Sequence, residues 1–144
     1  MSSERKVDPF AAIILVISII GIILLATQYF ASFYLGGGQY RHSCLDCEYA
    51  TGGDLAALII ILILLILQIV VALNDLIPKR FIKIDLDKWG MVLGGLTIFW
   101  VIVGIASFGI AYALYEWWPD TSFYSSIIAG IINTVLFYLK FKNK

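Results

Sequence analysis

Residues 55–73 read LAALIIILILLILQIVVAL, and this stretch decides the fold class. It contains no charged residue, and Gln68 is its single strongly polar side chain. A helix that rises about 1.5 Å per residue needs roughly 20 apolar residues to cross a hydrocarbon core about 30 Å thick. Because the run is continuous and lacks the alternation of a membrane β-barrel strand, it predicts a membrane-spanning helix.

Three further stretches are free of charge and of similar length: Pro9–Leu35, Trp89–Tyr115 and Ser122–Leu139. Apolar residues make up 61% of the chain and charged residues only 14%, against about 45–50% and about 25% in an ordinary soluble domain. We therefore expect an all-α fold, an integral membrane four-helix bundle that forms a single domain over residues 1–144. The expected location is the cell membrane, as a multi-pass protein, with the lipid bilayer as its first partner. The formal net charge of +0 offers no field that would attract nucleic acid.

The distribution of basic residues predicts the orientation. Of the ten lysine and arginine residues, only Arg41 lies between the first and second spans, and none lies between the third and fourth. By the positive-inside rule, the N- and C-termini are cytoplasmic and the segments 36–54 and 116–121 face outward. Aromatic residues next to these outer segments are expected to form interfacial belts, and Trp89 is expected to mark the inner interface. The belt residues are Tyr29, Phe30, Phe33, Tyr34, Tyr40, Tyr115, Trp117, Trp118 and Tyr124.

Small residues recur on one face of the third span, at steps of three and four. Such a stripe lets helix backbones approach closely. The first and fourth spans carry shorter stripes, whereas the second span is almost wholly Leu, Ile and Val, which suits contact with lipid or with another subunit. The packing residues predicted on the third span are Gly90, Gly94, Thr97, Val101, Gly104, Ser107 and Ala111; those on the first are Ser18, Gly21, Leu25, Gln28 and Ser32, and those on the fourth are Ser126, Gly130 and Asn133.

The polar content of the spans bears on function. Gln28, Gln68 and Asn133 are expected to form hydrogen bonds between helices. No Asp, Glu, Lys, Arg or His lies inside the four stretches, which argues against an autonomous pump because ion and proton pathways usually carry such residues. The sequence also lacks a phosphate-binding Gly-rich motif, a Gly-x-Ser-x-Gly and a His-Glu-x-x-His.

The outer segment 39–49, QYRHSCLDCEY, gathers the single histidine and both cysteines. Three interpretations of this segment stay open. Cys44 and Cys47 can form a local structural disulfide in an oxidising compartment, or they can act as a redox dithiol of Cys-x-x-Cys spacing. As a third interpretation, His42, Cys44 and Cys47 with an acidic neighbour can bind a metal ion.

Two family resemblances follow from these features. The chain has four predicted spans with both ends inside, a cysteine pair in the first outer loop and a third span that opens KWGMVLGG at Lys88. In these features it resembles the claudin and peripheral myelin protein class of tetraspan proteins. This resemblance covers the whole chain as topology; a barrier function is not carried over, because the outer loop lacks that family's Trp-Gly-Leu-Trp signature. The Cys-x-x-Cys before the second span is similar to that of the quinone-linked disulfide-generating proteins of bacterial membranes. That likeness implies Cys44 and Cys47 as the dithiol, Arg41 as a nearby cation and a quinone as cofactor.

Two functions are therefore predicted. The first is a small non-enzymatic tetraspan protein, an accessory or structural subunit that packs with other membrane protein subunits or with itself and needs neither cofactor nor metal. The alternative is a membrane thiol-disulfide oxidoreductase that uses Cys44 and Cys47 with a quinone-like partner.

Overall fold

Four long helices make up most of the fold. The structure, a computed structural model, describes residues 9–35, 39–45, 52–77 and 86–142. The helices are α1 (Pro9–Thr27), α2 (Gly52–Leu76), α3 (Asp87–Ala111) and α4 (Thr121–Lys142). Each is long and apolar enough to cross a membrane. The predicted four-helix fold is confirmed.

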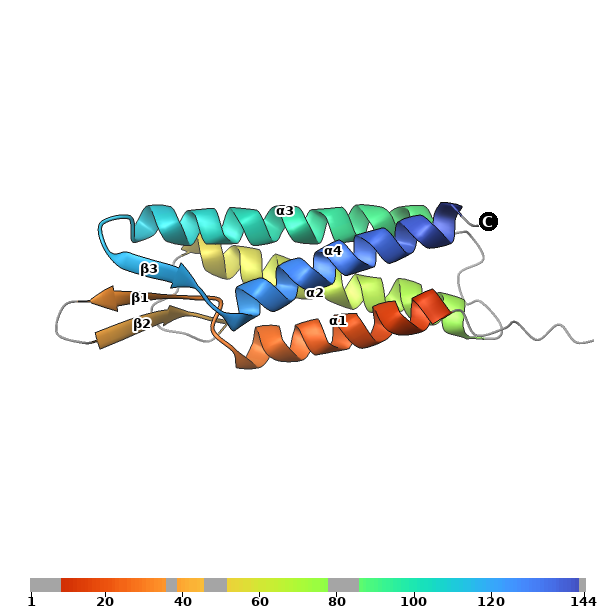
Figure 1. Cartoon of the computed structure of the whole chain (residues 1–144), viewed down its shortest axis with the longest axis horizontal. Helices are drawn as coiled ribbons and strands as arrows, with labels where there is room; N and C mark the ends of the chain where they lie inside the picture. The colour runs from red at the N-terminus through yellow and green to blue at the C-terminus, as the bar shows by residue number, and fades with distance from the viewer. Residues whose placement is uncertain (1–8, 36–38, 46–51, 78–85, 143–144) are drawn as a thin grey trace, which may run out of the picture.

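The helices form an antiparallel bundle in which every helix packs against two others. α1 contacts α2 and α4, and α3 also contacts α2 and α4. A small sheet lies at one end of the bundle, where α1 and α3 end and α2 and α4 begin (Figure 1). We call this the sheet end. At the other end, the terminal end, α1 begins and α4 finishes (Figure 1).

The sheet was missing from the sequence prediction. It consists of β1 (Ala31–Leu35), β2 (Gln39–Ser43) and β3 (Glu116–Pro119), all antiparallel, in the order β2-β1-β3. The first and third spans were predicted to continue to Leu35 and Tyr115, but α1 ends at Thr27 and α3 at Ala111. Beyond α1, the backbone hydrogen bonds run to other segments of the chain: the N–H of Phe30 donates to the carbonyl of Ser43 over 2.7 Å.

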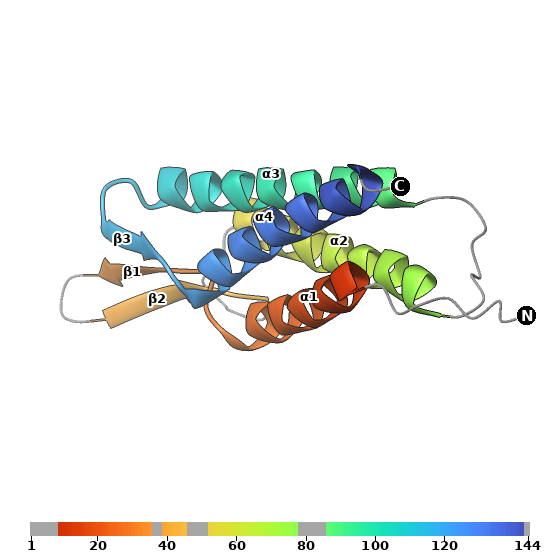
Figure 2. The ribbon, with the colours of Figure 1, turned by 45° about the vertical axis from the view of Figure 1, so that its right-hand side comes forward.

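Figure 2 shows how the sheet is joined to the helices: β3 follows α3 and leads directly into α4. Asp120 forms this corner. Its backbone N–H donates to the carbonyl of Phe30 over 2.9 Å, and its carboxylate accepts a hydrogen bond of 2.6 Å from the Ser32 hydroxyl. The sheet is therefore fixed to the start of α4.

Aromatic side chains fill the junction between sheet and bundle. Phe33 stacks on Tyr112 with ring centroids 3.8 Å apart and meets the edge of Phe108 at 6.1 Å. Phe30 and Phe33 are 0% and 2% exposed. Their prediction as interfacial belt residues was wrong, because the turn of the chain after α1 directs both rings into the core. Tyr29, Tyr115, Trp118 and Tyr124 remain exposed.

The outward faces of the helices are apolar. Exposed aliphatic side chains occur on all four helices, such as Val16, Ile63, Ile102 and Ile128. A surface of this kind is stable against lipid and poorly soluble in water. α2 has the largest buried share of the four helices, and its Ile61 is fully buried. It still exposes Ile59, Ile63 and Leu67, so its contact with lipid or with another subunit stays a prediction.

Candidate functional site

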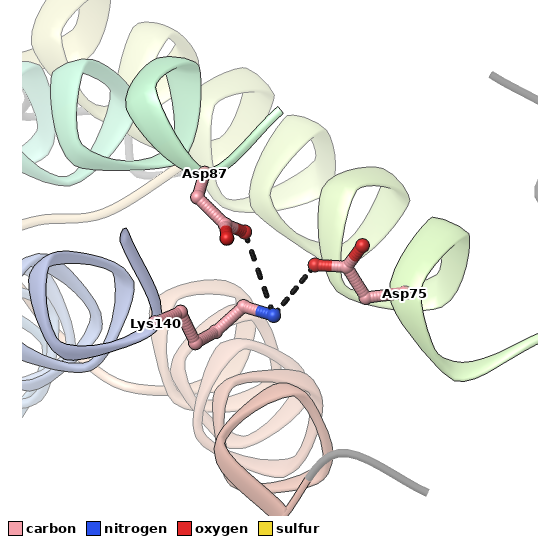
Figure 3. Close-up of polar contacts among 3 residues, drawn as sticks. All are labelled: Asp75, Asp87 and Lys140. Carbon is pink, nitrogen blue, oxygen red and sulfur yellow. Dashed lines mark hydrogen bonds and ion pairs between the residues drawn. The ribbon is translucent and has the colours of Figure 1, made fainter. Parts of the chain in front are cut away.

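A group of three ionised side chains ties three helices together at the terminal end. Lys140 of α4 places its Nζ 2.6 Å from a carboxylate oxygen of Asp75 and 3.4 Å from one of Asp87 (Figure 3). We call these residues the ion triad. All three side chains are buried, with exposed fractions of 3–4% for Lys140 and Asp75 and 0% for Asp87.

The ion triad owes its position to helix ends. Asp75 lies in the last turn of α2, Asp87 is the first residue of α3, and Lys140 lies in the last turn of α4. Since buried charges are costly unless they are paired, the ammonium between two carboxylates holds these three helix ends in one register. By the positive-inside rule, Lys140 counts only as one of the basic residues on the cytoplasmic side. Nothing local in the sequence pairs it with Asp75, which lies 65 residues earlier.

The ion triad also qualifies the expectation of charge-free spans. α2 and α4 extend beyond the apolar stretches from which they were predicted, so Asp54, Asp75 and Lys140 lie within helices. All three side chains are buried, and all sit near helix ends. The middle of each described helix carries no charge.

A layer of uncharged polar side chains crosses the middle of the bundle. Asn133 of α4 donates through Nδ2 to Ser18 Oγ of α1 over 2.9 Å and to Gln68 Oε1 of α2 over 2.7 Å. Gln68 donates through Nε2 to Thr97 Oγ1 of α3 over 2.8 Å. These four residues, which we call the amide layer, are fully buried and come one from each helix. The predicted interhelical bonds of Gln68 and Asn133 are confirmed.

Gln28, which was also expected to form a hydrogen bond between helices, lies outside the amide layer. Gln28 follows the last residue of α1, where its side chain is exposed and its backbone N–H donates to the carbonyl of Leu24 over 2.9 Å. The amide layer instead uses Ser18, which the small-residue pattern of the first span had marked for packing. A polar residue in the centre of a span, and not one at its end, was the better signal, because only the central position is surrounded by other helices.

Polar contacts also anchor the sheet end. The Ser43 hydroxyl of β2 donates a hydrogen bond to the Asp54 carboxylate in the first turn of α2, and both side chains are fully buried. A carboxylate near a helix N-terminus is favoured by the helix dipole. Together with the bond between Ser32 and Asp120, this contact attaches two strands to the beginnings of two helices.

The predicted stripe on α3 lies against its neighbours along most of its length. Gly90 faces Phe137, and Gly94 faces Thr134, so closely that a Cβ atom at either glycine would overlap the facing side chain. A Cβ at Gly104 would lie 2.9 Å from that of Ala57. Thr97 and Val101 are fully buried, and Ser107 lies beside Gly53. Ala111 departs from the expectation: it is exposed as the last residue of α3, and Phe108 closes the buried face instead.

The described part of the cysteine segment consists of β2 and the two residues that follow it. Cys44 directly follows β2 and is 9% exposed, whereas Cys47 lies outside the described residues. Arg41 and His42 belong to β2, in register with Phe33 and Ser32 of β1. The disulfide, the redox dithiol and the metal site built on this segment all stay predictions. In the described part of the chain, no three His, Cys, Asp or Glu residues are grouped as metal ligands.

The chain was compared with protein families, curated proteins and solved structures. No protein-family model, curated protein or solved structure matches the chain.

Proposed function

We propose that this chain is a non-enzymatic tetraspan protein of the cell membrane, with both ends in the cytoplasm, that acts as an accessory or structural subunit of a membrane protein assembly. One observation carries the proposal. Inside the bundle, the ion triad and the amide layer join polar side chains of different helices, while the outward helix faces are apolar. Such an interior stabilises a scaffold, and the outward faces are free to pack with other helices.

A shallow groove between α1 and α4 is the proposed contact surface. It encloses about 230 Å³, and its floor includes Gly21 of α1 and Ser125 and Ala129 of α4. Ala129 packs against Gly21 within the chain, whereas Ser125, one turn earlier on α4, is half-buried and its small side chain leaves room for an approaching helix. Isoleucine side chains, including Ile20 and Ile128, flank this floor. The groove therefore suits an apolar transmembrane helix from another subunit or from a second copy.

The test is photo-crosslinking in native membranes. A photoreactive residue in place of Ile128, which borders the groove and is 52% exposed, should give a discrete protein adduct. The same residue in place of Ile102, also 52% exposed but on α3 and away from the groove, should label lipid only. The mass of the adduct distinguishes a second 16.1 kDa copy from a different subunit.

A filling variant makes the test specific. Ser125→Leu adds bulk to the floor of the groove and should remove the adduct at Ile128 without lowering the amount of protein. Adducts of equal yield at Ile128 and Ile102, or an adduct that persists in Ser125→Leu, would refute the assignment of this surface. The membrane thiol-disulfide oxidoreductase that uses Cys44 and Cys47 with a quinone-like partner remains the alternative.

A further inference from the structure

An aromatic hollow at the sheet end has no role in the scaffold described above. It encloses about 460 Å³ and is lined by Tyr34, Glu116, Trp117 and Trp118. Tyr34 of β1 lies directly opposite Glu116 of β3, and Trp118 follows two residues after Glu116. Because side chains alternate along a strand, these three share one face of the sheet. Trp117 belongs to the other face, where its ring lies 6.0 Å from that of Phe108.

The charge of this hollow selects for a cation. Glu116 is exposed, and its carboxylate makes no hydrogen bond or ion pair with any described residue. The faces of tyrosine and tryptophan rings carry negative partial charge. Among the described side chains that line the hollow, a carboxylate beside aromatic rings therefore favours a cation.

The lining also restricts the kind of cation. Calcium and magnesium ions need about six oxygen ligands, and the hollow offers a single carboxylate. A primary ammonium has three N–H donors, each of which needs an acceptor. A methylated quaternary ammonium has no donor to satisfy, and aromatic side chains bind it through cation–π attraction. The aromatic lining thus suits a quaternary ammonium.

The turn before β3 indicates where the site lies relative to lipid. Ile110 near the end of α3 is 79% exposed, and Leu114 in the following turn is 98% exposed. Aliphatic side chains this exposed are stable next to hydrocarbon and unfavourable in water. Lipid therefore extends to this turn, and Glu116, two residues after Leu114, comes at the depth of the headgroups, where tryptophan and tyrosine are enriched.

From these observations we propose that the hollow binds the trimethylammonium group of a phosphatidylcholine headgroup. Tyr34 and Trp118 supply the aromatic walls, and Glu116 supplies the countercharge. The inference is independent of the accessory-subunit proposal. The hollow shares no lining residue with the groove between α1 and α4, and its proposed ligand is a lipid.

The experiment measures which lipid the full-length protein retains. Protein in nanodiscs made from equal amounts of phosphatidylcholine, phosphatidylethanolamine and phosphatidylglycerol with identical acyl chains is released and analysed by native mass spectrometry. Phosphatidylcholine should be enriched among the bound lipids, and tetramethylammonium chloride, but not sodium chloride at the same ionic strength, should displace it. Glu116→Gln and Trp118→Leu should each lower the enrichment by roughly three- to tenfold.

Controls separate this site from general lipid adhesion. Trp89→Leu removes a tryptophan that is 60% exposed at the terminal end, and it should leave the enrichment unchanged. Equal retention of the three lipids, or enrichment that survives both Glu116→Gln and Trp118→Leu, overturns the proposal. Binding of tetramethylammonium without any lipid preference also overturns it, in favour of a soluble cation or a cationic side chain of another protein.

Discussion

Replacement of Lys140 by methionine tests the ion triad most directly. Methionine keeps a long apolar side chain but removes the ammonium that lies 2.6 Å from Asp75 and 3.4 Å from Asp87. Both carboxylates then stay buried, at 4% and 0% exposure, without that cation. We expect Lys140→Met to destabilise the bundle strongly.

The size of the effect follows from the geometry. Two unit charges 4 Å apart attract each other by about 4 kcal/mol at an effective dielectric constant of about 20, and both contacts of Lys140 are shorter than that. Desolvation of the ions offsets much of this gain, but removal of one member of a buried pair typically costs about 3–5 kcal/mol. Since whole proteins are stable by about 5–15 kcal/mol, Lys140→Met should remove a large share of the free energy of unfolding.

The assay is reversible unfolding of the full-length protein by SDS in mixed micelles, followed by circular dichroism. Lys142→Met is the matched control, because Lys142 lies two residues further along α4 and is exposed. It should change the free energy of unfolding by no more than about 0.5 kcal/mol. Combining Lys140→Met with Asp75→Asn and Asp87→Asn removes the unpaired charges and should restore most of the loss. The reasoning fails if Lys140→Met and Lys142→Met unfold alike, or if the triple variant is no more stable than Lys140→Met.

Four other predictions can be checked in the same protein. Gly94→Ala places a Cβ against Thr134 and should lower the free energy of unfolding in the SDS assay by about 1–3 kcal/mol. Gly95→Ala places its Cβ in open space and should leave that free energy unchanged or raise it. Equal effects of the two changes would contradict the close approach of α3 and α4. Asn133→Leu removes two bonds of the amide layer and should cost about 1–3 kcal/mol, and no loss would show that the layer adds little to stability. If Cys44 belongs to a structural disulfide, Cys44→Ser should affect abundance only; a mixed disulfide with a soluble extracytoplasmic thiol protein would instead support the oxidoreductase. A reporter that works only in the cytoplasm should be active when fused after Lys144, and its inactivity there would reverse the proposed orientation.

The amino-acid sequence by itself determined the helices. Hydrocarbon offers no partner for backbone N–H and C=O groups, so an apolar run such as Leu55–Leu73 has few alternatives to a helix, whatever it packs against. The same reasoning identified Gln68 and Asn133, because a polar side chain in the middle of a span needs a partner on another helix. The small residues of the third span, such as Gly94, likewise marked a face on which a neighbour could approach.

The helix ends and the contacts beyond them were decided by the tertiary structure. Apolar composition alone does not distinguish Ala31–Leu35 from a last turn of α1; this segment is a strand because β2 and β3 satisfy its backbone on both sides. The ion triad arises in the same way. Asp75 and Lys140 are 65 residues apart, and each is an ordinary charged residue at a helix end until the packing of α2, α3 and α4 brings them within 2.6 Å of each other. Contacts of this kind depend on the mutual register of helices, which no local pattern of residues specifies.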